Sequence, residues 1–212
     1  MNHNHKLIEF LKIRLANPLT GLDSQKLMAP TTPKDFFRTF KPTETAQKSA
    51  VLILLINNSE DFDILFTLRS KNISHSGQIS FPGGRCDLGE SAEQTALRET
   101  FEETGIKSNS ITLLGRLTDL FVPPSDNIIT PVVGYMDKII NVTQNSDEVE
   151  EIFFVPLKKL ISSEHRKIEQ WNFNGINVNV PLWDIHPTTP LWGATAMITS
   201  ELVELCKELY KK

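Results

Sequence analysis

Three glutamates near the middle of the chain stand at helical spacing. Glu99, Glu102 and Glu103 are related as i, i+3 and i+4, so a helix would present their carboxylates on one face. Three like charges in that arrangement repel one another unless a cation neutralises them. Oxygen ligands suit hard divalent ions, so the pattern predicts a Mg²⁺ or Mn²⁺ site. The alternative is a solvated helix surface on which Arg98 and Glu102 form an i, i+4 ion pair.

The helix that would carry these glutamates has clear end signals. Ser91 and Gln94 form a capping-box pattern, which predicts that the helix begins one residue after the serine. Gly105 favours the left-handed conformation that closes a helix, so the helix should end there. Leu97 and Phe101 fall on the side opposite the glutamates, and the sequence predicts that they supply the packing face.

The residues before the helix favour the metal site over the solvated surface. Gly83 and Gly84 allow a backbone turn to approach the helix closely. The spacing G-x5-E-x7-R-E-x-x-E-E-x-G-hydrophobic resembles the signature of the Nudix hydrolase family. Its positions are filled by Gly84, Glu90, Arg98, Glu99, Glu102, Glu103, Gly105 and Ile106. One position departs from the pattern, because Thr100 stands where that family usually has an aliphatic residue.

This resemblance implies an α/β fold, the Nudix-type α/β/α sandwich with a mixed central sheet. It also implies divalent-metal-dependent hydrolysis of a phosphoanhydride bond. Glu99 and Glu103 are the first choices as metal ligands because they lie one turn apart on one face, with Glu102 as a further ligand. Arg98 is expected to orient the glutamates through a salt bridge, and Glu90 to steady the loop before the helix.

The general base has several candidates. Outside the helix they are Glu148, Glu150 and Glu151, which follow one another closely before a predicted strand. Glu148 is favoured among these, although the segment could equally be a solvated acidic turn. Glu102, on the helix itself, is the rival base.

A second, narrower resemblance lies in residues 65–84, which read LFTLRSKNISHSGQISFPGG. This stretch is similar to the segment of the coenzyme A pyrophosphatase branch of Nudix hydrolases. The matching residues are Leu65, Thr67, Arg69, Ser70, Gly77, Phe81, Pro82, Gly83 and Gly84. The segments 130–134, 147–149 and 192–196 also look like that branch. The second arginine of the branch segment is missing here, and the interval between Ser70 and Gly77 is one residue shorter than in the branch pattern. Lys71 or His75 would have to supply the positive charge of that arginine instead.

The resemblance implies hydrolysis of coenzyme A or an acyl derivative to 4′-phosphopantetheine and adenosine 3′,5′-bisphosphate. Another Nudix pyrophosphatase, acting on ADP-ribose or a similar nucleotide, is the first alternative. A nucleotide-binding module without turnover is the second, and the complete set of carboxylates speaks against it. The substrate-binding candidates are Arg69, Phe81, Gly83 and Gly84, of which Phe81 is expected chiefly to set up the turn.

Hydrophobic patterning predicts the rest of the domain. Strands are expected at 50–56, 62–69, 78–81, 111–117, 128–135, 149–155, 168–173 and 176–180, and a closing helix at 192–210. Asn174-Gly175 is a strong hairpin signal. A docking helix at 4–15 and an irregular arm to about residue 48 precede them. We therefore expect an N-terminal helix and arm at 1–45 and a hydrolase domain at 46–212.

Composition limits the partners. The 212 residues carry a net charge of −4, which gives no basic excess for nucleic acid, and we expect no membrane segment. Cys86 and Cys206 fit no metal-site spacing and are compatible with a reducing compartment. The C-terminus carries no peroxisomal address, so a cytoplasmic enzyme is the default expectation. The expected partner is a small nucleotide substrate, and a homodimer is left open.

Overall fold

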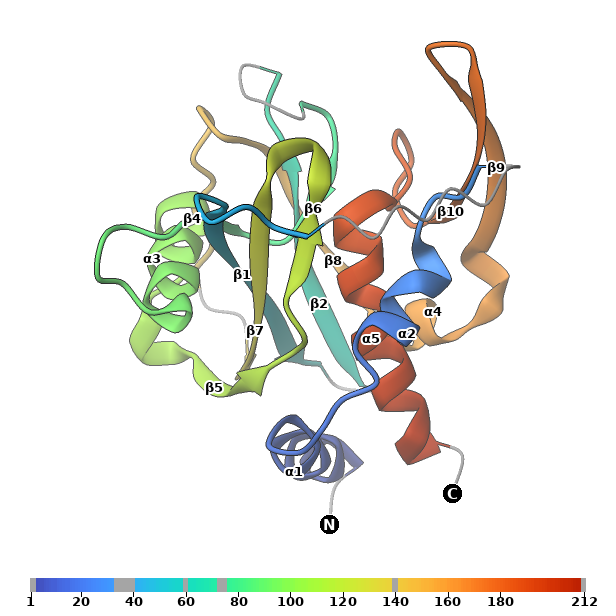
Figure 1. Cartoon of the computed structure of the whole chain (residues 1–212). Helices are drawn as coiled ribbons and strands as arrows, with labels where there is room; N and C mark the ends of the chain where they lie inside the picture. The colour runs from blue at the N-terminus through green and yellow to red at the C-terminus, as the bar shows by residue number, and fades with distance from the viewer. Residues whose placement is uncertain (1–2, 33–40, 59–60, 72–75, 139–140, 211–212) are drawn as a thin grey trace.

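A mixed β-sheet forms the centre of the protein (Figure 1). The computed structural model describes residues 3–32, 41–58, 61–71, 76–138 and 141–210. Within them the main sheet has eight strands, with the order β3-β2-β1-β7-β5; β4 pairs with β1, β6 with β7 and β8 with β2. The strands are β1 (Gln47–Asn57), β2 (Phe62–Arg69), β3 (Ile79–Ser80), β4 (Gly83–Arg85), β5 (Thr112–Arg116), β6 (Leu120–Val122), β7 (Asn127–Met136) and β8 (Val149–Pro156).

The central strand is buried on both faces because its side chains alternate between two cores. Ala50, Leu52 and Leu54 of β1 belong to one hydrophobic cluster, whereas Ile53 and Leu55 belong to the other. β1 pairs in parallel with β7 and antiparallel with β2. This continuous apolar run is typical of a strand covered on both sides.

Helices cover the two faces of the sheet (Figure 1). The described helices are α1 (His3–Leu15), α2 (Leu22–Gln25), α3 (Ala92–Thr104), α4 (Leu157–Ile161) and α5 (Gly193–Tyr210), with four short 3₁₀ turns between elements. α3 packs on one face, where Ala96 joins the cluster of Leu52. α5 packs on the other, where Leu202 joins the cluster of Ile53. The expected α/β/α sandwich with a mixed central sheet is therefore confirmed.

The N-terminal segment packs on the same core as α5. Leu7 and Leu11 of α1 and Met28 are completely buried, and all three belong to the cluster that contains Ile53. The guanidinium of Arg14 also donates through two nitrogens to the two carboxylate oxygens of Glu208 near the end of α5. The segment expected to be an irregular arm also contains α2 and a 3₁₀ turn at Lys26–Met28, while the boundary at residues 45 and 46 stays a prediction.

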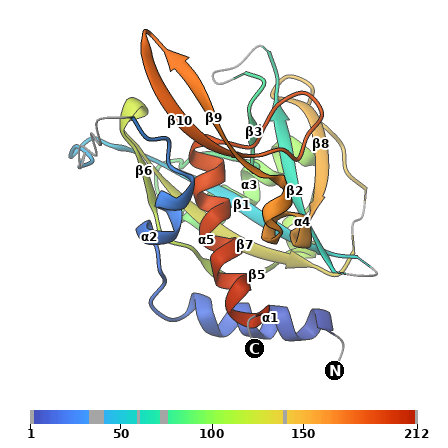
Figure 2. The same ribbon diagram turned by 90° about the vertical axis from the view of Figure 1, so that its right-hand side faces the viewer.

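A β-hairpin projects from the sandwich (Figure 2). It consists of β9 (Arg166–Phe173) and β10 (Ile176–Trp183), and its turn places Asn174 and Gly175 at positive φ, as the hairpin signal predicted. Sequence patterns did not give β4, β6, α2 or α4, because each has only three to five residues and too few to show a period. No helix among the described residues combines the length and the apolar character needed to cross a membrane.

Candidate active site

A glycine turn lies directly against α3. A Cβ added at Gly84 would stand 2.4 Å from Oε1 of Glu99, so only glycine leaves room for that carboxylate. A Cβ added at Gly83 would stand 2.3 Å from the carbonyl oxygen of Ala50 on the neighbouring strand. The backbone N–H of Gly83 also donates to Oε1 of Glu103 at 3.4 Å. The two glycines therefore allow strand β4 and helix α3 to meet at the glutamates.

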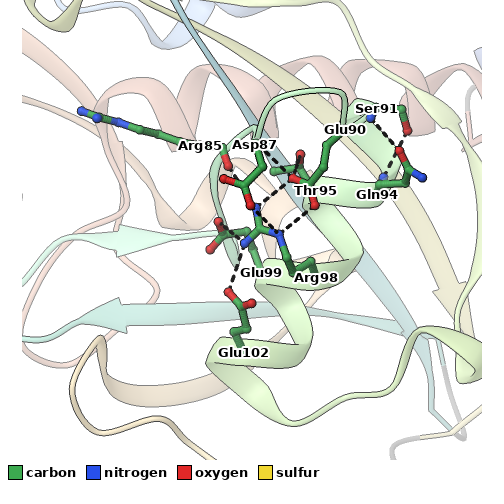
Figure 3. Close-up of polar contacts among 9 residues, drawn as sticks. All are labelled: Arg85, Asp87, Glu90, Ser91, Gln94, Thr95, Arg98, Glu99 and Glu102. Atoms are coloured by element: carbon green, nitrogen blue, oxygen red, sulfur yellow. Dashed lines mark hydrogen bonds and ion pairs between the residues drawn. The ribbon is translucent and has the colours of Figure 1, made fainter.

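The ends of α3 follow from local sequence signals. The Ser91 hydroxyl accepts a hydrogen bond from the backbone N–H of Gln94, whose side chain in turn accepts from the backbone N–H of Ser91 (Figure 3). Gly105 closes the helix in the left-handed conformation at φ 71°. The capping box and the glycine stop are confirmed, and they fix the register in which Glu103 faces the sheet.

The predicted packing face of α3 is wrong. Phe101 is 51% exposed, and the side of the helix that packs on the sheet consists of small and polar residues. Thr100 and Thr104 are completely buried there, and each hydroxyl donates to the carbonyl oxygen four residues earlier. The same side presents Glu103, which is 4% exposed, to the interior.

Arg98 organises the polar groups at the start of the site (Figure 3). Its guanidinium donates to both carboxylate oxygens of Glu90 at 2.9 Å, to Glu99 at 2.8 Å and to Glu102 at 3.1 Å. It also donates to the carbonyl oxygen of Arg85 at 3.0 Å, which ties the helix to β4. Since the five donors of arginine form a rigid fork, this set of bonds holds Glu99 and Glu90 in one geometry.

Three carboxylates meet beside the glycine turn. Glu99 and Glu103 from α3 and Glu148 from the segment before β8 each offer an oxygen, and these oxygens lie within 4.8 Å of one another. Glu103 is buried, Glu99 is half-buried and Glu148 is exposed, so the group opens to solvent on one side. This is the only such group among the described residues in which three His, Cys, Asp or Glu side chains could hold a metal ion.

Comparison with known proteins agrees with this geometry. The family model described as the NUDIX domain matches residues 46–174 of the chain. The chain belongs to the Nudix family.

Its relatives include named hydrolases. Nudix hydrolase 3 of Caenorhabditis elegans is 35% identical over 179 residues, which cover 76% of this chain and 75% of the relative. The human mitochondrial coenzyme A diphosphatase is 32% identical over 163 residues, covering 74% of this chain and 68% of the relative. The solved structure of the Nudix hydrolase RenU from M. smegmatis superposes with a TM-score of 0.53 at 16% identity, covering 77% of this chain and 88% of that one, and it shows the fold. The chain is thus a Nudix hydrolase, an enzyme related to coenzyme A diphosphatases.

The environment of each Nudix carboxylate sets its protonation. Burial raises the pKa of Glu103 to about 8, although the hydrogen bond from Gly83 and the charge of Arg69 oppose that rise. Burial also raises the pKa of Glu99, and its bond to Arg98 opposes the shift. The hydrogen bonds from Arg98 lower the pKa of Glu90 to about 2. In the metal-free protein Glu103 therefore holds a proton at neutral pH that a cation would displace.

Two residues predicted for the site are not members of the group of three meeting carboxylates. Glu102 turns to solvent and pairs with Arg98, so it is not among the three carboxylates that come together. Phe81 is buried and stacks on Phe66 with ring centroids 4.9 Å apart. That position fits the turn-forming role expected of Phe81, because its ring belongs to the core.

The other two base candidates, Glu150 and Glu151, do not lie in the group of three carboxylates. Glu151 accepts at 3.2 Å from the ring nitrogen Nε2 of His186, a buried residue of the loop before α5, and Glu150 is exposed. Neither belongs to the carboxylate group with Glu99. His75, a candidate for the missing cation of the coenzyme A segment, lies outside the described residues.

Sequence reasoning found Glu148 as a base candidate but missed that it meets the helix glutamates. No local period signals this, because residues 103 and 148 are joined only by tertiary packing. The backbone N–H of Asn145 donates to the carbonyl oxygen of Glu103 at 3.1 Å, and that bond brings the acidic segment onto the end of α3.

Proposed function

We propose that this Nudix hydrolase cleaves the diphosphate of coenzyme A or an acyl-coenzyme A. Water would be added across the phosphoanhydride, giving 4′-phosphopantetheine, or its acyl derivative, and adenosine 3′,5′-bisphosphate. The observation that carries the reaction class is the meeting of Glu99, Glu103 and Glu148 beside the glycine turn. The coenzyme A substrate is supported by the diphosphatase relative and by the matching residues of segment 65–84.

The three carboxylates fit a divalent cation such as Mg²⁺ or Mn²⁺. They offer oxygen ligands only, and two oxygens bound to one Mg²⁺ at about 2.0–2.1 Å can stand up to about 4.2 Å apart. The oxygens of Glu99, Glu103 and Glu148 already lie within 4.8 Å of one another, so small rotations suffice. When bound, the ion would neutralise the diphosphate charge and acidify a nearby water.

The surrounding residues would keep these ligands in place. Arg98 holds Glu99 from one side through its 2.8 Å bond, while its fork to Glu90 fixes the loop that precedes α3. Such partners of ligating carboxylates commonly tune metal affinity and activity. Arg98 thereby acts as the positioning cation that the sequence predicts.

Proton removal from water requires a carboxylate that reaches solvent beside the cluster. Glu148 meets this condition, because it is the exposed member of the group. Glu102 is the rival base, but its carboxylate is engaged by Arg98. Arg69, the last residue of β2, would bind a substrate phosphate. Its charge already acts on the carboxylate of Glu103.

The experiment that tests this function uses a panel of diphosphates. The purified chain with Mn²⁺ or Mg²⁺ is incubated separately with coenzyme A, an acyl-coenzyme A and ADP-ribose, and both products are identified by mass spectrometry. Carrying out the reaction in H₂¹⁸O shows which phosphorus receives the water oxygen. Glu99→Gln should lower kcat by at least roughly 100-fold, whereas Glu93→Gln, on the same helix but paired with Arg116, serves as the matched control.

The result identifies the substrate class. Formation of 4′-phosphopantetheine and adenosine 3′,5′-bisphosphate by the wild type supports the proposal. Faster cleavage of ADP-ribose would favour the alternative, which the missing second arginine of segment 65–84 makes worth testing. Absence of hydrolysis across the panel with both metals would indicate a binding module.

A further inference from the structure

Glu148 stands on a segment that has to be held in place before its carboxylate can meet the helix. It precedes β8 and is exposed, so the path of the backbone decides where its carboxylate lies. The register of β2 and β8 shifts here: Leu68 pairs with Glu151 but Arg69 pairs with Val149, which leaves Glu150 as the extra residue of a bulge. Bulges redirect the chain next to functional sites. The backbone around Glu148 therefore depends on specific anchors.

Ser70 provides anchors from the end of β2. Its backbone N–H donates to the carbonyl oxygen of Glu148 at 2.9 Å, and its hydroxyl donates to the carbonyl oxygen of Asp147 at 2.8 Å. Ser70 is only 5% exposed, so water cannot readily replace these bonds. One residue thus contacts two consecutive peptide groups, one of which belongs to Glu148 itself.

Asn145 holds the same segment from the side of α3. Its backbone N–H donates to the carbonyl oxygen of Glu103, and its own carbonyl oxygen accepts from the N–H groups of Glu148 at 3.2 Å and Val149 at 2.9 Å. The Asn145 side chain accepts from the N–H of Asp147 at 3.2 Å. The segment is therefore clamped between α3 and β2, and the hydroxyl of Ser70 is a part of this clamp that a substitution can remove without changing a bond between backbone groups.

We propose that Ser70 is a positioning residue for the metal site. Its hydroxyl fixes the peptide before Glu148 so that the Glu148 carboxylate meets Glu99 and Glu103. This inference rests on the metal site of the proposed function and adds to it a residue that touches neither metal nor substrate. Removing the Ser70 hydroxyl should therefore lower the affinity for the cation, and it should do so only by displacing Glu148.

The test is a double-mutant cycle read by Mn²⁺ binding. The dissociation constant for Mn²⁺, measured by electron paramagnetic resonance of the free ion, is compared for wild type, Ser70→Ala, Glu148→Gln and the double variant. We expect Ser70→Ala to weaken binding on the order of tenfold. In the Glu148→Gln background the same substitution should change affinity by less than about twofold, because the carboxylate it positions is no longer charged.

Two further variants separate positioning from general loss of packing. Ser200→Ala removes a hydroxyl with the same environment, since Ser200 is 2% exposed and donates to the carbonyl oxygen of Ser24 at 2.8 Å, far from the glutamates in sequence and on α5. It should leave the Mn²⁺ affinity unchanged even if it lowers the melting temperature. Ser70→Thr keeps a hydroxyl and should bind Mn²⁺ within about threefold of wild type.

The outcomes distinguish this proposal from the proposed function. Binding of Mn²⁺ needs no substrate, so failure to hydrolyse coenzyme A would overturn the substrate assignment and leave the Ser70 measurement intact. The positioning role would be overturned if Ser70→Ala left the Mn²⁺ affinity unchanged, or if Ser200→Ala lowered it equally. It would also be overturned if Ser70→Ala lowered the affinity as much in the Glu148→Gln background as in the wild type. With an active wild type, Ser70→Ala should also raise the Mn²⁺ concentration for half-maximal rate while leaving KM for the substrate within about twofold.

Discussion

The carboxylate of Glu99 occupies the space that a side chain at residue 84 would need. A Cβ at Gly84 would lie 2.4 to 2.6 Å from three atoms of that carboxylate group, which is closer than Cβ atoms in proteins approach non-bonded heavy atoms. The glycine and the glutamate therefore depend on each other: the Glu99 carboxylate lies against the turn because residue 84 has no side chain, and the group of Glu99, Glu103 and Glu148 lies at that point of contact.

Gly84→Ala should weaken metal binding far more than it weakens folding. The added methyl would displace the Glu99 carboxylate, which is the far end of a flexible side chain and can move without shifting the backbone. We expect Mn²⁺ affinity to fall by roughly tenfold or more, as for other losses of ligand orientation. Isothermal titration with Mn²⁺ and thermal unfolding of the same sample measure the two effects. Gly84→Ala could instead lower the melting temperature strongly, and by the same amount in the wild-type and Glu99→Ala backgrounds. That result would show that the methyl clashes with something other than this carboxylate.

The three glutamates of α3 should not be equivalent. Glu99→Gln and Glu103→Gln remove members of the carboxylate group, and each should lower kcat by at least roughly 100-fold, the upper end of the cost of disturbing a metal ligand's partner. Glu102→Gln removes only a half-exposed partner of Arg98 and should lower kcat by less than about tenfold. Rates at saturating Mn²⁺ decide the matter. A loss for Glu102→Gln as large as that for Glu99→Gln would make Glu102 a ligand or the general base.

The sequence predicted the carboxylates better than it predicted how their helix packs. The capping box and Gly105 gave the ends of α3, and the i, i+4 spacing gave the meeting of Glu99 with Glu103 at one face, because all of these follow from local helix geometry. The packing face was wrong because hydrophobic periodicity assumes that apolar residues lie inside. Here the face that packs on the sheet carries small and polar residues together with Glu103, and Phe101 faces solvent.

The position of Glu148 could not be predicted for a different reason. Its approach to α3 depends on the bond from the Asn145 backbone to Glu103, on the bulge opposite Arg69 and on the bond from the Ser70 hydroxyl to Asp147. Each of these joins residues that lie far apart in the chain. Strands such as β2 and β8 were found at nearly their observed bounds, but their pairing and its register shift are tertiary features. The sequence therefore named all three residues of the carboxylate group, but it did not predict that Glu148 meets Glu99 and Glu103.

The outward orientation of Phe101 predicts a small effect of truncating it. Phe101→Ser should change the free energy of unfolding by less than about 1 kcal/mol, because half of the side chain is already in water. Ile106→Ala, just beyond the same helix and 3% exposed, should cost about 2–5 kcal/mol. Urea unfolding of both variants measures the difference. Equal destabilisation by the two substitutions would mean that the aromatic ring packs in the core after all.

Arg98→Lys should damage the site although it keeps the positive charge. A lysine cannot reproduce the fork that binds Glu90 through two nitrogens while also reaching Glu99 and the Arg85 carbonyl oxygen. We expect a roughly 10- to 100-fold fall in metal affinity or kcat. Arg116→Lys is the matched control, because Arg116 makes a similar forked pair with Glu93 at the exposed start of the helix. Equal losses in both variants would place the effect in helix stability.

The raised pKa of Glu103 predicts how pH should act on the metal-free protein. The pKa is about 8 in the folded chain, where burial is the largest cause, and close to 4.5 when the carboxyl is exposed by unfolding. Between these values the folded state holds a proton that the unfolded state has lost, so the free energy of unfolding should fall as the pH rises from about 4.5 to about 8. Thermal unfolding with a chelator measures this fall, and Glu103→Gln should reduce it. Because a bound cation replaces the proton, the rise in melting temperature on adding Mg²⁺ should be larger at pH 8 than at pH 6, and a rise that is independent of pH would contradict ligation by Glu103.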